Sequence, residues 1–195
     1  MRGAIALLLT AGQALACPGP ADLQTGITLR SDVYTTTYRQ AGPGVVQSTV
    51  RANDGAFAAV TDLAFGLIPL ATRATFADPM IPDQDTAYDL TAAGLADRLP
   101  PRPGATFALA TRVTDQITGQ SEAVVITVTA GQPGDVRIGD CVLAGLPVSV
   151  LFERPGHWYR AETMVLSDLG LSYVARQTVA GLPEQLIRPL EIAAE

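Results

Sequence analysis

The chain contains no lysine, a single histidine and only two cysteines among its 195 residues. Structural zinc sites need four His or Cys ligands and catalytic sites usually need three, so this composition nearly excludes zinc held by those residues. Every basic residue is an arginine, the arginines are scattered singly, and the net charge is −6. Nucleic acids and anionic membranes attract a cationic surface, and we therefore exclude them as main partners.

Charged residues are scarce, at 16%, whereas hydrophobic residues make up 48% of the chain. This balance is the opposite of that in disordered chains, which carry many charges and few apolar residues. No hydrophobic run approaches the roughly 20 residues that a transmembrane helix needs. No glycine-rich phosphate-binding loop occurs, and no cofactor is predicted. We expect a single β-rich domain over residues 17–195, without a transmembrane segment.

The first sixteen residues have the order of a secretory signal peptide. Arg2 precedes an apolar stretch over residues 4–9, and Ala14-Leu15-Ala16 supplies the small residues of a cleavage site. We predict that residues 1–16 are removed and that the mature chain, which begins at Cys17, is periplasmic or secreted.

Two fates are open for Cys17. A cysteine at this position carries the lipid in bacterial lipoproteins, but their signal places leucine three residues earlier, where Ala14 stands here. An even number of cysteines in an exported chain favours pairing. We predict a disulfide between Cys17 and Cys141. A lipid anchor at Cys17 is the alternative, and the two exclude each other because both use the same sulfur atom.

Alternation of apolar and polar residues dominates the chain and is typical of β-strands. Turn sequences such as AGPG at 41–44 and NDG at 53–55 separate the alternating segments. Residues 90–99 are the one helical candidate, with Thr91 as the N-cap. We expect an all-β, mainly antiparallel fold, a sandwich, barrel or half-barrel of about 8–11 strands with at most one or two short helices. The clearest strand segments are residues 26–40, 45–52, 105–115, 121–130, 147–153, 158–166 and 171–179.

A short internal similarity links residues 60–73 with residues 166–176. Both stretches carry Asp-Leu, then Gly-Leu, then an Ala near an Arg, and the second copy has a gap before its Gly-Leu. A duplicated β unit would produce this pattern. Coincidence is an equally open interpretation, because the match is short.

His157 is the leading catalytic candidate, because it is the only histidine. As a general base it would need an orienting carboxylate, and Glu153 and Glu162 are the nearest in sequence. The other interpretation is structural. His157 lies beside the Pro-Gly turn at 155–156 and is then only part of a β-hairpin. No G-x-S-x-G nucleophile motif accompanies it.

Carboxylates suggest two further kinds of site. Asp78, Asp83, Asp85 and Asp89 lie close together in the sequence, and calcium takes several such oxygen ligands from one loop. Their spacing matches no EF-hand, so an ordinary solvated loop is the other interpretation. A glycosidase would need two carboxylates across a cleft, and the sequence does not single out such a pair.

The stretch over residues 162–179 resembles a pattern found in uncharacterised envelope β-proteins of Gram-negative bacteria. In that pattern a strand ends in an acidic-Leu-Gly turn, and the next strand carries an arginine. Asp168, Leu169, Gly170 and Arg176 stand in the matching places, while Ser167 replaces the usual proline. The resemblance implies an antiparallel sheet in the periplasm and no catalytic residue.

We therefore expect a non-enzymatic periplasmic binding or envelope-assembly module. Its partner would be an apolar ligand or an envelope protein, because a curved β-sheet can enclose apolar ligands. The alternative is a small periplasmic hydrolase that uses His157 or a carboxylate pair.

Overall fold

The computed structural model describes residues 17–195, and the predicted signal peptide lies outside these described residues. Fourteen strands form one antiparallel sheet in which strands adjacent in sequence usually pair. The predicted all-β class is confirmed, although the sheet contains fourteen strands rather than eight to eleven. The strands are β1 (Ile27–Ser31), β2 (Tyr34–Gly42), β3 (Val45–Ala52), β4 (Phe57–Ala64), β5 (Ile68–Phe76), β6 (Gln84–Tyr88), β7 (Thr106–Asp115), β8 (Ser121–Ala130), β9 (Gly134–Ile138), β10 (Cys141–Arg154), β11 (His157–Leu166), β12 (Leu171–Val179), β13 (Gln185–Leu186) and β14 (Pro189–Ala194).

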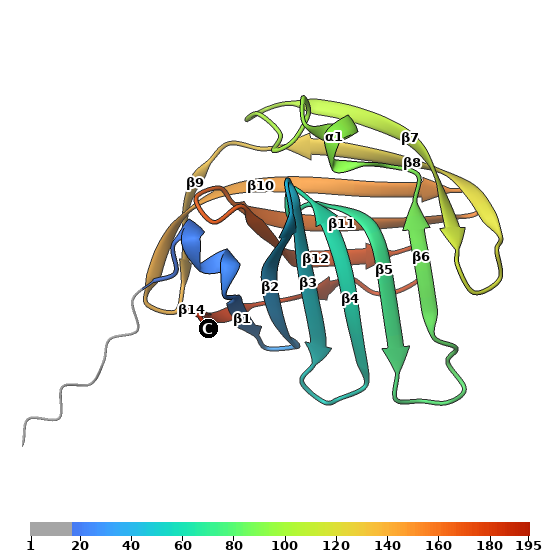
Figure 1. Cartoon of the computed structure of the whole chain (residues 1–195), viewed down its shortest axis with the longest axis horizontal. Coiled ribbons are helices and arrows are strands. Elements are labelled where there is room, and N and C mark those ends of the chain that lie inside the picture. Colours follow the sequence, from blue (N-terminus) through green and yellow to red (C-terminus); the bar gives the residue numbers. More distant parts are fainter. Residues whose placement is uncertain (1–16) are drawn as a thin grey trace, which may run out of the picture.

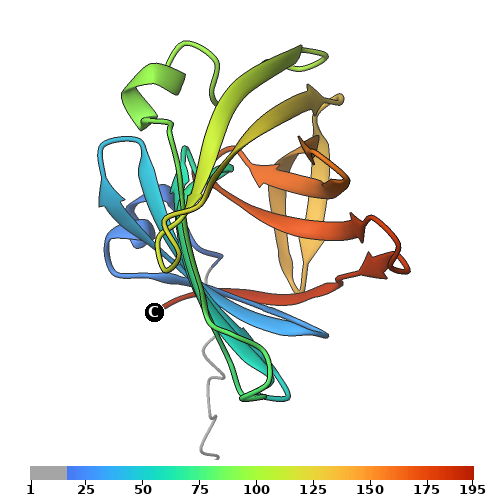
Figure 2. The ribbon, with the colours of Figure 1, turned by 90° about the vertical axis from the view of Figure 1, so that its right-hand side faces the viewer.

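The sheet curls so that its two halves cross. Strands β2–β6 run nearly vertically at the front of Figure 1, and β8 and β10–β12 run nearly horizontally behind them. Figure 2 shows the same arrangement from the side, with the blue and green strands on the left and the orange and red strands on the right. We call β1–β6 the first half and β7–β12 the second half.

Apolar side chains from both halves fill the space between them in two clusters. One cluster joins β4 and β5 to β7, β8 and β10, and contains Ile68, Ile126 and Val150. The other joins β1–β3 to β9, β10 and β12, and contains Ile27 and Leu171. Strand alternation therefore places one face of each half in a shared core, as expected for a sheet with one solvated side.

Strand β10 is unusually long because it changes partner along its length. Residues 141–145 pair with β9, and residues 148–153 pair with β8. Pro147 falls between these two ladders, where its missing N–H costs no hydrogen bond to either neighbour. Sequence reasoning placed a strand start at this proline, whereas the strand continues through it.

The last segment of the chain touches both edges of the sheet. β13 pairs with β12, and β14 pairs with β1 from Ile27 opposite Ala194 to Ser31 opposite Pro189, with one register shift between Arg30 and Ser31. The strand ladder therefore begins at β13 and ends at β14. The short segment that contains β13 and β14 therefore lies between the first half and the second half, where the two edges of the curled sheet come together.

A disulfide fixes the N-terminal segment to β10. Cys17 and Cys141 are bonded, with their Cα atoms 5.5 Å apart, as predicted. The 3-10 helix η1 (Pro20–Gln24) follows Cys17 and buries Leu23 in the second core cluster. Because the sulfur of Cys17 is used in this bond, it is not free to carry a lipid.

One short α-helix, α1 (Ala92–Leu95), lies in the connection between β6 and β7. The predicted cap is confirmed, since the Thr91 hydroxyl accepts a hydrogen bond from the Gly94 N–H at 3.1 Å. Within residues 17–195, no helix has the length and apolar character required to cross a membrane.

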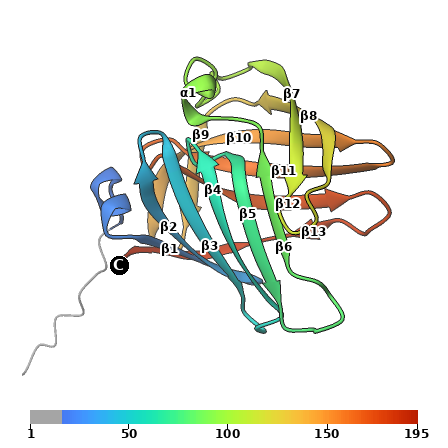
Figure 3. The same cartoon turned by 45° about the vertical axis from the view of Figure 1, so that its right-hand side comes forward.

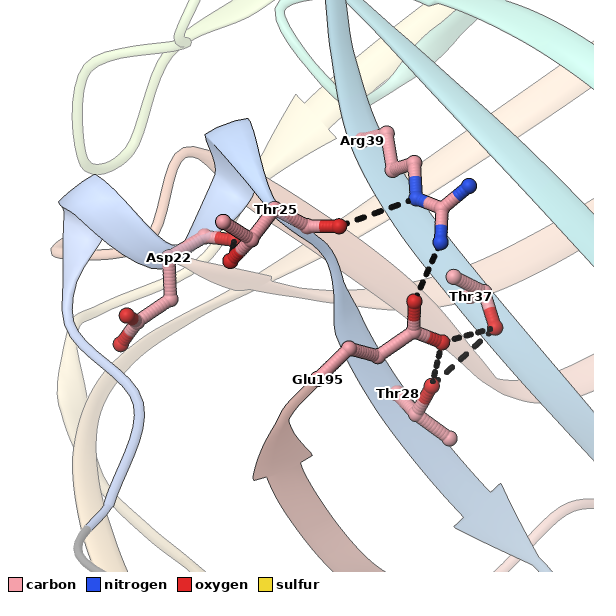
Figure 4. Close-up of polar contacts among 6 residues, drawn as sticks. All are labelled: Asp22, Thr25, Thr28, Thr37, Arg39 and Glu195. Atoms are coloured by element: carbon pink, nitrogen blue, oxygen red, sulfur yellow. Dashed lines mark hydrogen bonds and ion pairs between the residues drawn. The ribbon is translucent and has the colours of Figure 1, made fainter.

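Glu195 is held against β1 and β2 by its side chain (Figure 4). Its carboxylate forms an ion pair with Arg39 at 2.5 Å and accepts hydrogen bonds from the hydroxyls of Thr28 and Thr37 at 2.8 and 3.2 Å. Arg39 is oriented in turn by a 3.1 Å hydrogen bond to the Thr25 carbonyl. These donors lower the pKa of the Glu195 carboxyl.

Candidate binding site at the aromatic end of the sheet

Six connections lie at one end of the curled sheet, because antiparallel strands reverse direction at each turn. They join β1 to β2, β3 to β4, β5 to β6, β7 to β8, β10 to β11, and β12 to β13. Figure 3 shows three of them, β5–β6, β10–β11 and β12–β13, on the right-hand side, opposite η1. We call this end the aromatic end, because six partly buried aromatic rings lie close to these connections.

Three of the rings come from the first half of the sheet. Tyr34 opens β2, Phe57 opens β4 and Phe76 closes β5. The ring centroids of Tyr34 and Phe57 are 5.5 Å apart in an edge-on arrangement, and those of Phe57 and Phe76 are 6.2 Å apart. These separations lie in the favourable range for aromatic pairs.

The other three rings join β6 to the second half. Tyr88 closes β6, Phe152 lies near the end of β10, and Tyr159 lies near the start of β11. The centroid of Phe152 is 6.2 Å from that of Tyr88 and 5.7 Å from that of Tyr159. Tyr159 is opposite Phe152 in the strand register, so both rings project from the same face.

Two glutamines connect the two groups of rings. The Tyr34 hydroxyl donates to the Gln185 side-chain oxygen at 3.4 Å, and the Tyr159 hydroxyl donates to Gln177 at the same distance. The Gln177 amide donates to Gln185. Burial, with smaller contributions from the nearby hydroxyls of Tyr34 and Tyr88, raises the pKa of Tyr159 to about 12. Tyr159 is therefore a neutral hydrogen-bonding group at neutral pH.

One ion pair borders the rings. Arg154 and Glu122 are 2.6 Å apart, and both are about half exposed. Both charges act on Tyr88, whose pKa is raised mainly by burial. The candidate site is therefore mostly apolar and neutral, with one compensated charge pair at its margin.

The three catalytic candidates from the sequence do not meet. His157 is opposite Arg154 in the hairpin register, whereas Glu153 is opposite Trp158. Side chains alternate along a strand, so Glu153 and Glu162 both project from the face opposite His157. Glu162 instead accepts a 3.0 Å hydrogen bond from the Ser149 hydroxyl. The structure therefore places no orienting carboxylate from this pair beside His157.

The four aspartates that were candidate calcium ligands likewise do not share one site. Asp78 accepts a hydrogen bond from the Met80 N–H at 2.9 Å, and Asp83 accepts one from the Phe76 N–H at 3.3 Å. Asp85 forms an ion pair with Arg73 at 3.5 Å. Asp89 is exposed after β6. In the described part of the chain, no group of three or more His, Cys, Asp or Glu side chains is arranged to hold a metal ion.

Two hollows flank α1 at the other end of the molecule. Their volumes are about 350 and 420 Å³, and Arg98 borders both. Arg98 lies over the Phe107 ring at 5.8 Å and donates to the Ala108 carbonyl at 3.2 Å. None of the six rings lines either hollow, so the aromatic end is a separate feature.

Sequence reasoning missed the ring cluster, because its members span Tyr34 to Tyr159 on six strands. A local signal was present for four of them. Phe57 and Phe76 lie beside turn sequences, and Phe152 and Tyr159 flank the RPGH turn. Aromatic residues that recur beside turns at one end of a meander indicate a shared location. A comparison of the chain with protein-family models, curated proteins and solved structures finds no match.

Proposed function

We propose that this chain is an exported, non-enzymatic binding protein whose aromatic end takes an amphipathic, lipid-like ligand. The observation that carries the proposal is the gathering of six partly exposed rings from both halves of the sheet around the Gln177–Gln185 pair. The side chains that line ligand sites are mostly apolar and aromatic, with a few polar groups that fix orientation. The rings supply the apolar surface here, and the hydroxyl and amide groups supply the orienting contacts.

The disulfide supports the exported location. Disulfides persist in oxidising compartments such as the periplasm and are rare in reducing ones. The resemblance of residues 162–179 to envelope proteins points the same way.

Dye binding tests the site directly. N-phenyl-1-naphthylamine, a neutral apolar dye, should bind the purified protein saturably, and lipid extracted from cell envelopes should compete with it. Tyr159→Ala should weaken binding about tenfold, which corresponds to about 1.4 kcal/mol. Trp158→Ala is the matched control, because Trp158 is the adjacent residue on the opposite face of β11. Equal affinities in the two variants, or no saturable binding, would overturn the proposal.

The mass of the mature protein tests its location. The mature chain should begin at Cys17, occur in the periplasmic fraction and gain two alkyl groups only after reduction. A chain that retains residues 1–16, or that carries acyl groups on Cys17, would contradict export with a closed disulfide.

A further inference from the structure

Strand β7 is paired unequally on its two sides. On one side it pairs with β8 along nearly its whole length. On the other side it pairs with β6 only over Val113–Asp115, and one further hydrogen bond joins the Asp89 N–H to the Arg112 carbonyl at 2.9 Å. The chain then leaves the sheet and forms the segment that contains α1, beside the start of β7 (Figure 1). Within residues 17–195, no strand continues the line of β6 along the start of β7.

This open edge presents the backbone groups of Thr106, Ala108 and Ala110. The residues of an antiparallel strand direct their N–H and C=O groups alternately toward its two neighbours. Arg112 accepts its hydrogen bond from Asp89 on the β6 side, so the residues two, four and six positions earlier also point away from β8. Their side chains are small, uncharged and exposed. Natural proteins usually block such edges with charged residues, prolines or bulges, and the stretch from Thr106 to Ala110 contains none of these.

The two hollows beside α1 lie along the open edge. Ala105 and Phe107 line one hollow, and Ala108–Ala110 line the other. Arg98 lies between them, where its guanidinium donates to the outward Ala108 carbonyl at 3.2 Å, as the N–H of an added strand would. The α1 segment therefore leaves space beside the edge, and the side chains of an extended peptide can enter it.

The two hollows differ in charge. Arg98 and Arg102 border the hollow beside Phe107 together with Asp97, which gives two positive charges against one negative charge. Arg98 and Asp89 border the other hollow, where the two charges balance. In the part of the chain that the structure describes, neither arginine forms an ion pair. The hollow beside Phe107 therefore favours an acidic side chain, and the other hollow favours an uncharged one.

We propose that the edge of β7 from Thr106 to Ala110 binds an extended peptide segment that carries an acidic side chain. The peptide adds a strand beside β7 by pairing with the outward N–H and C=O groups, and its carboxylate lies between Arg98 and Arg102. These backbone groups recur every two residues, roughly 6.8 Å apart, and another extended backbone has donors and acceptors at that spacing. This inference goes beyond the proposed function, because none of the six rings takes part in it.

Selection of a phage-displayed library of random heptapeptides on the purified protein tests this site. The selected peptides should carry aspartate or glutamate, and they should bind saturably as synthetic peptides with blocked termini. Replacement of the acidic residue by its amide should weaken binding about fivefold, as expected for an ion pair near the surface.

Two substitutions in the protein test the two kinds of contact separately. Ala108→Pro removes an outward N–H that the ladder with β8 does not use, and it should weaken peptide binding about tenfold. Arg102→Glu should weaken the binding of the acidic peptides and strengthen that of the same peptides with lysine in the acidic position. The matched control is Arg51→Glu, because Arg51 is an exposed arginine on β3 that forms no ion pair within residues 17–195. This control should bind the acidic peptides as the wild type does.

Thermal unfolding shows whether Ala108→Pro remains folded, and Arg102→Glu keeps the test decisive if it does not. Dye binding at the aromatic end should be unchanged in both variants, which separates this result from the proposed function. Failure to select any peptide would overturn the inference. So would selected peptides that lack an acidic residue, or that bind Ala108→Pro as tightly as the wild type. A dimer in solution that Ala108→Pro separates would assign the edge to a second copy of this chain instead.

Discussion

Gly66 and Gly170 touch at the end of the sheet opposite the aromatic rings. A Cβ atom on Gly66 would lie 2.6 Å from the Gly170 carbonyl oxygen, and both glycines have a φ of +67°. The Ser172 hydroxyl, which is buried, donates to the Gly66 carbonyl at 2.5 Å. The two Gly-Leu motifs that are similar in sequence are therefore in contact, and they join the β4–β5 turn to the β11–β12 turn.

We expect Gly66→Ala to destabilise the protein by about 2–4 kcal/mol, because it adds both overpacking and an unfavourable φ. Gly55→Ala is the control, since Gly55 has a φ of +76° but no neighbouring atom within 4 Å. Gly55→Ala should lower the free energy of unfolding by only about 1–2 kcal/mol, which is the cost of the unfavourable φ alone. Urea unfolding measures both values, and equal costs would show that the contact with Gly170 contributes nothing.

Reduction of the disulfide should lower the free energy of unfolding by up to about 5 kcal/mol, because the bond closes a loop between residues 124 apart. Cys141→Ala should have a similar effect without any reductant. Urea unfolding with and without dithiothreitol checks this in the wild type, and Cys141→Ala should not respond to the reductant. A wild-type protein equally stable in both conditions would contradict the expectation.

Glu195 should make stability depend on pH in the acid range. Its pKa is lowered below the ordinary 4.5 by hydrogen bonds from Thr28, Arg39 and Thr37. A carboxyl with a depressed folded-state pKa contributes stability above its unfolded pKa, and that contribution disappears as pH falls through the folded value. The Glu195→Gln variant should therefore lose less of its free energy of unfolding between pH 6 and pH 3 than the wild type does. Glu191→Gln, which disturbs only an exposed ion pair with Arg30, should change this slope less.

The His157→Ala variant should fold, and its rate of substrate hydrolysis should equal that of the wild type. His157 lacks Glu153 and Glu162 as orienting partners, because they project from the other face of the hairpin. Assays with p-nitrophenyl esters, phosphates and glycosides should give rates equal to those in buffer for both proteins. A rate above buffer that vanishes in His157→Ala would instead favour the hydrolase alternative.

Local sequence patterns predicted the strands with strong alternation. The segments at 121–130 and 171–179 coincide with β8 and β12, and Thr91 caps the helix as expected. β6 escaped prediction, because its QDTAY sequence is polar and partly exposed. The predicted strand over residues 26–40 is divided into β1 and β2 by a turn in which the Ser31 hydroxyl accepts from the Tyr34 N–H. A hydrogen bond of this kind produces no periodic pattern of apolar and polar residues in the sequence.

The candidate site depends on how the sheet curls, which no short window of sequence contains. Tyr34 and Gln185 meet although 151 residues separate them. Strand order and register bring them together, and these follow from the packing of the whole core. The cysteine pair could be predicted, by contrast, because only one intramolecular pairing exists for two cysteines.

The bordering segment β13–β14 has a consequence for how the protein folds. Ile27 pairs with Ala194, so the ladder between β1 and β14 joins the two extremes of the described chain. Contacts this distant in sequence form slowly, because a long loop must close before they contribute. Until residues 189–194 arrive, β1 presents an unpaired edge that can recruit strands from other molecules. Folding chains are therefore most prone to aggregate just before β14 pairs with β1.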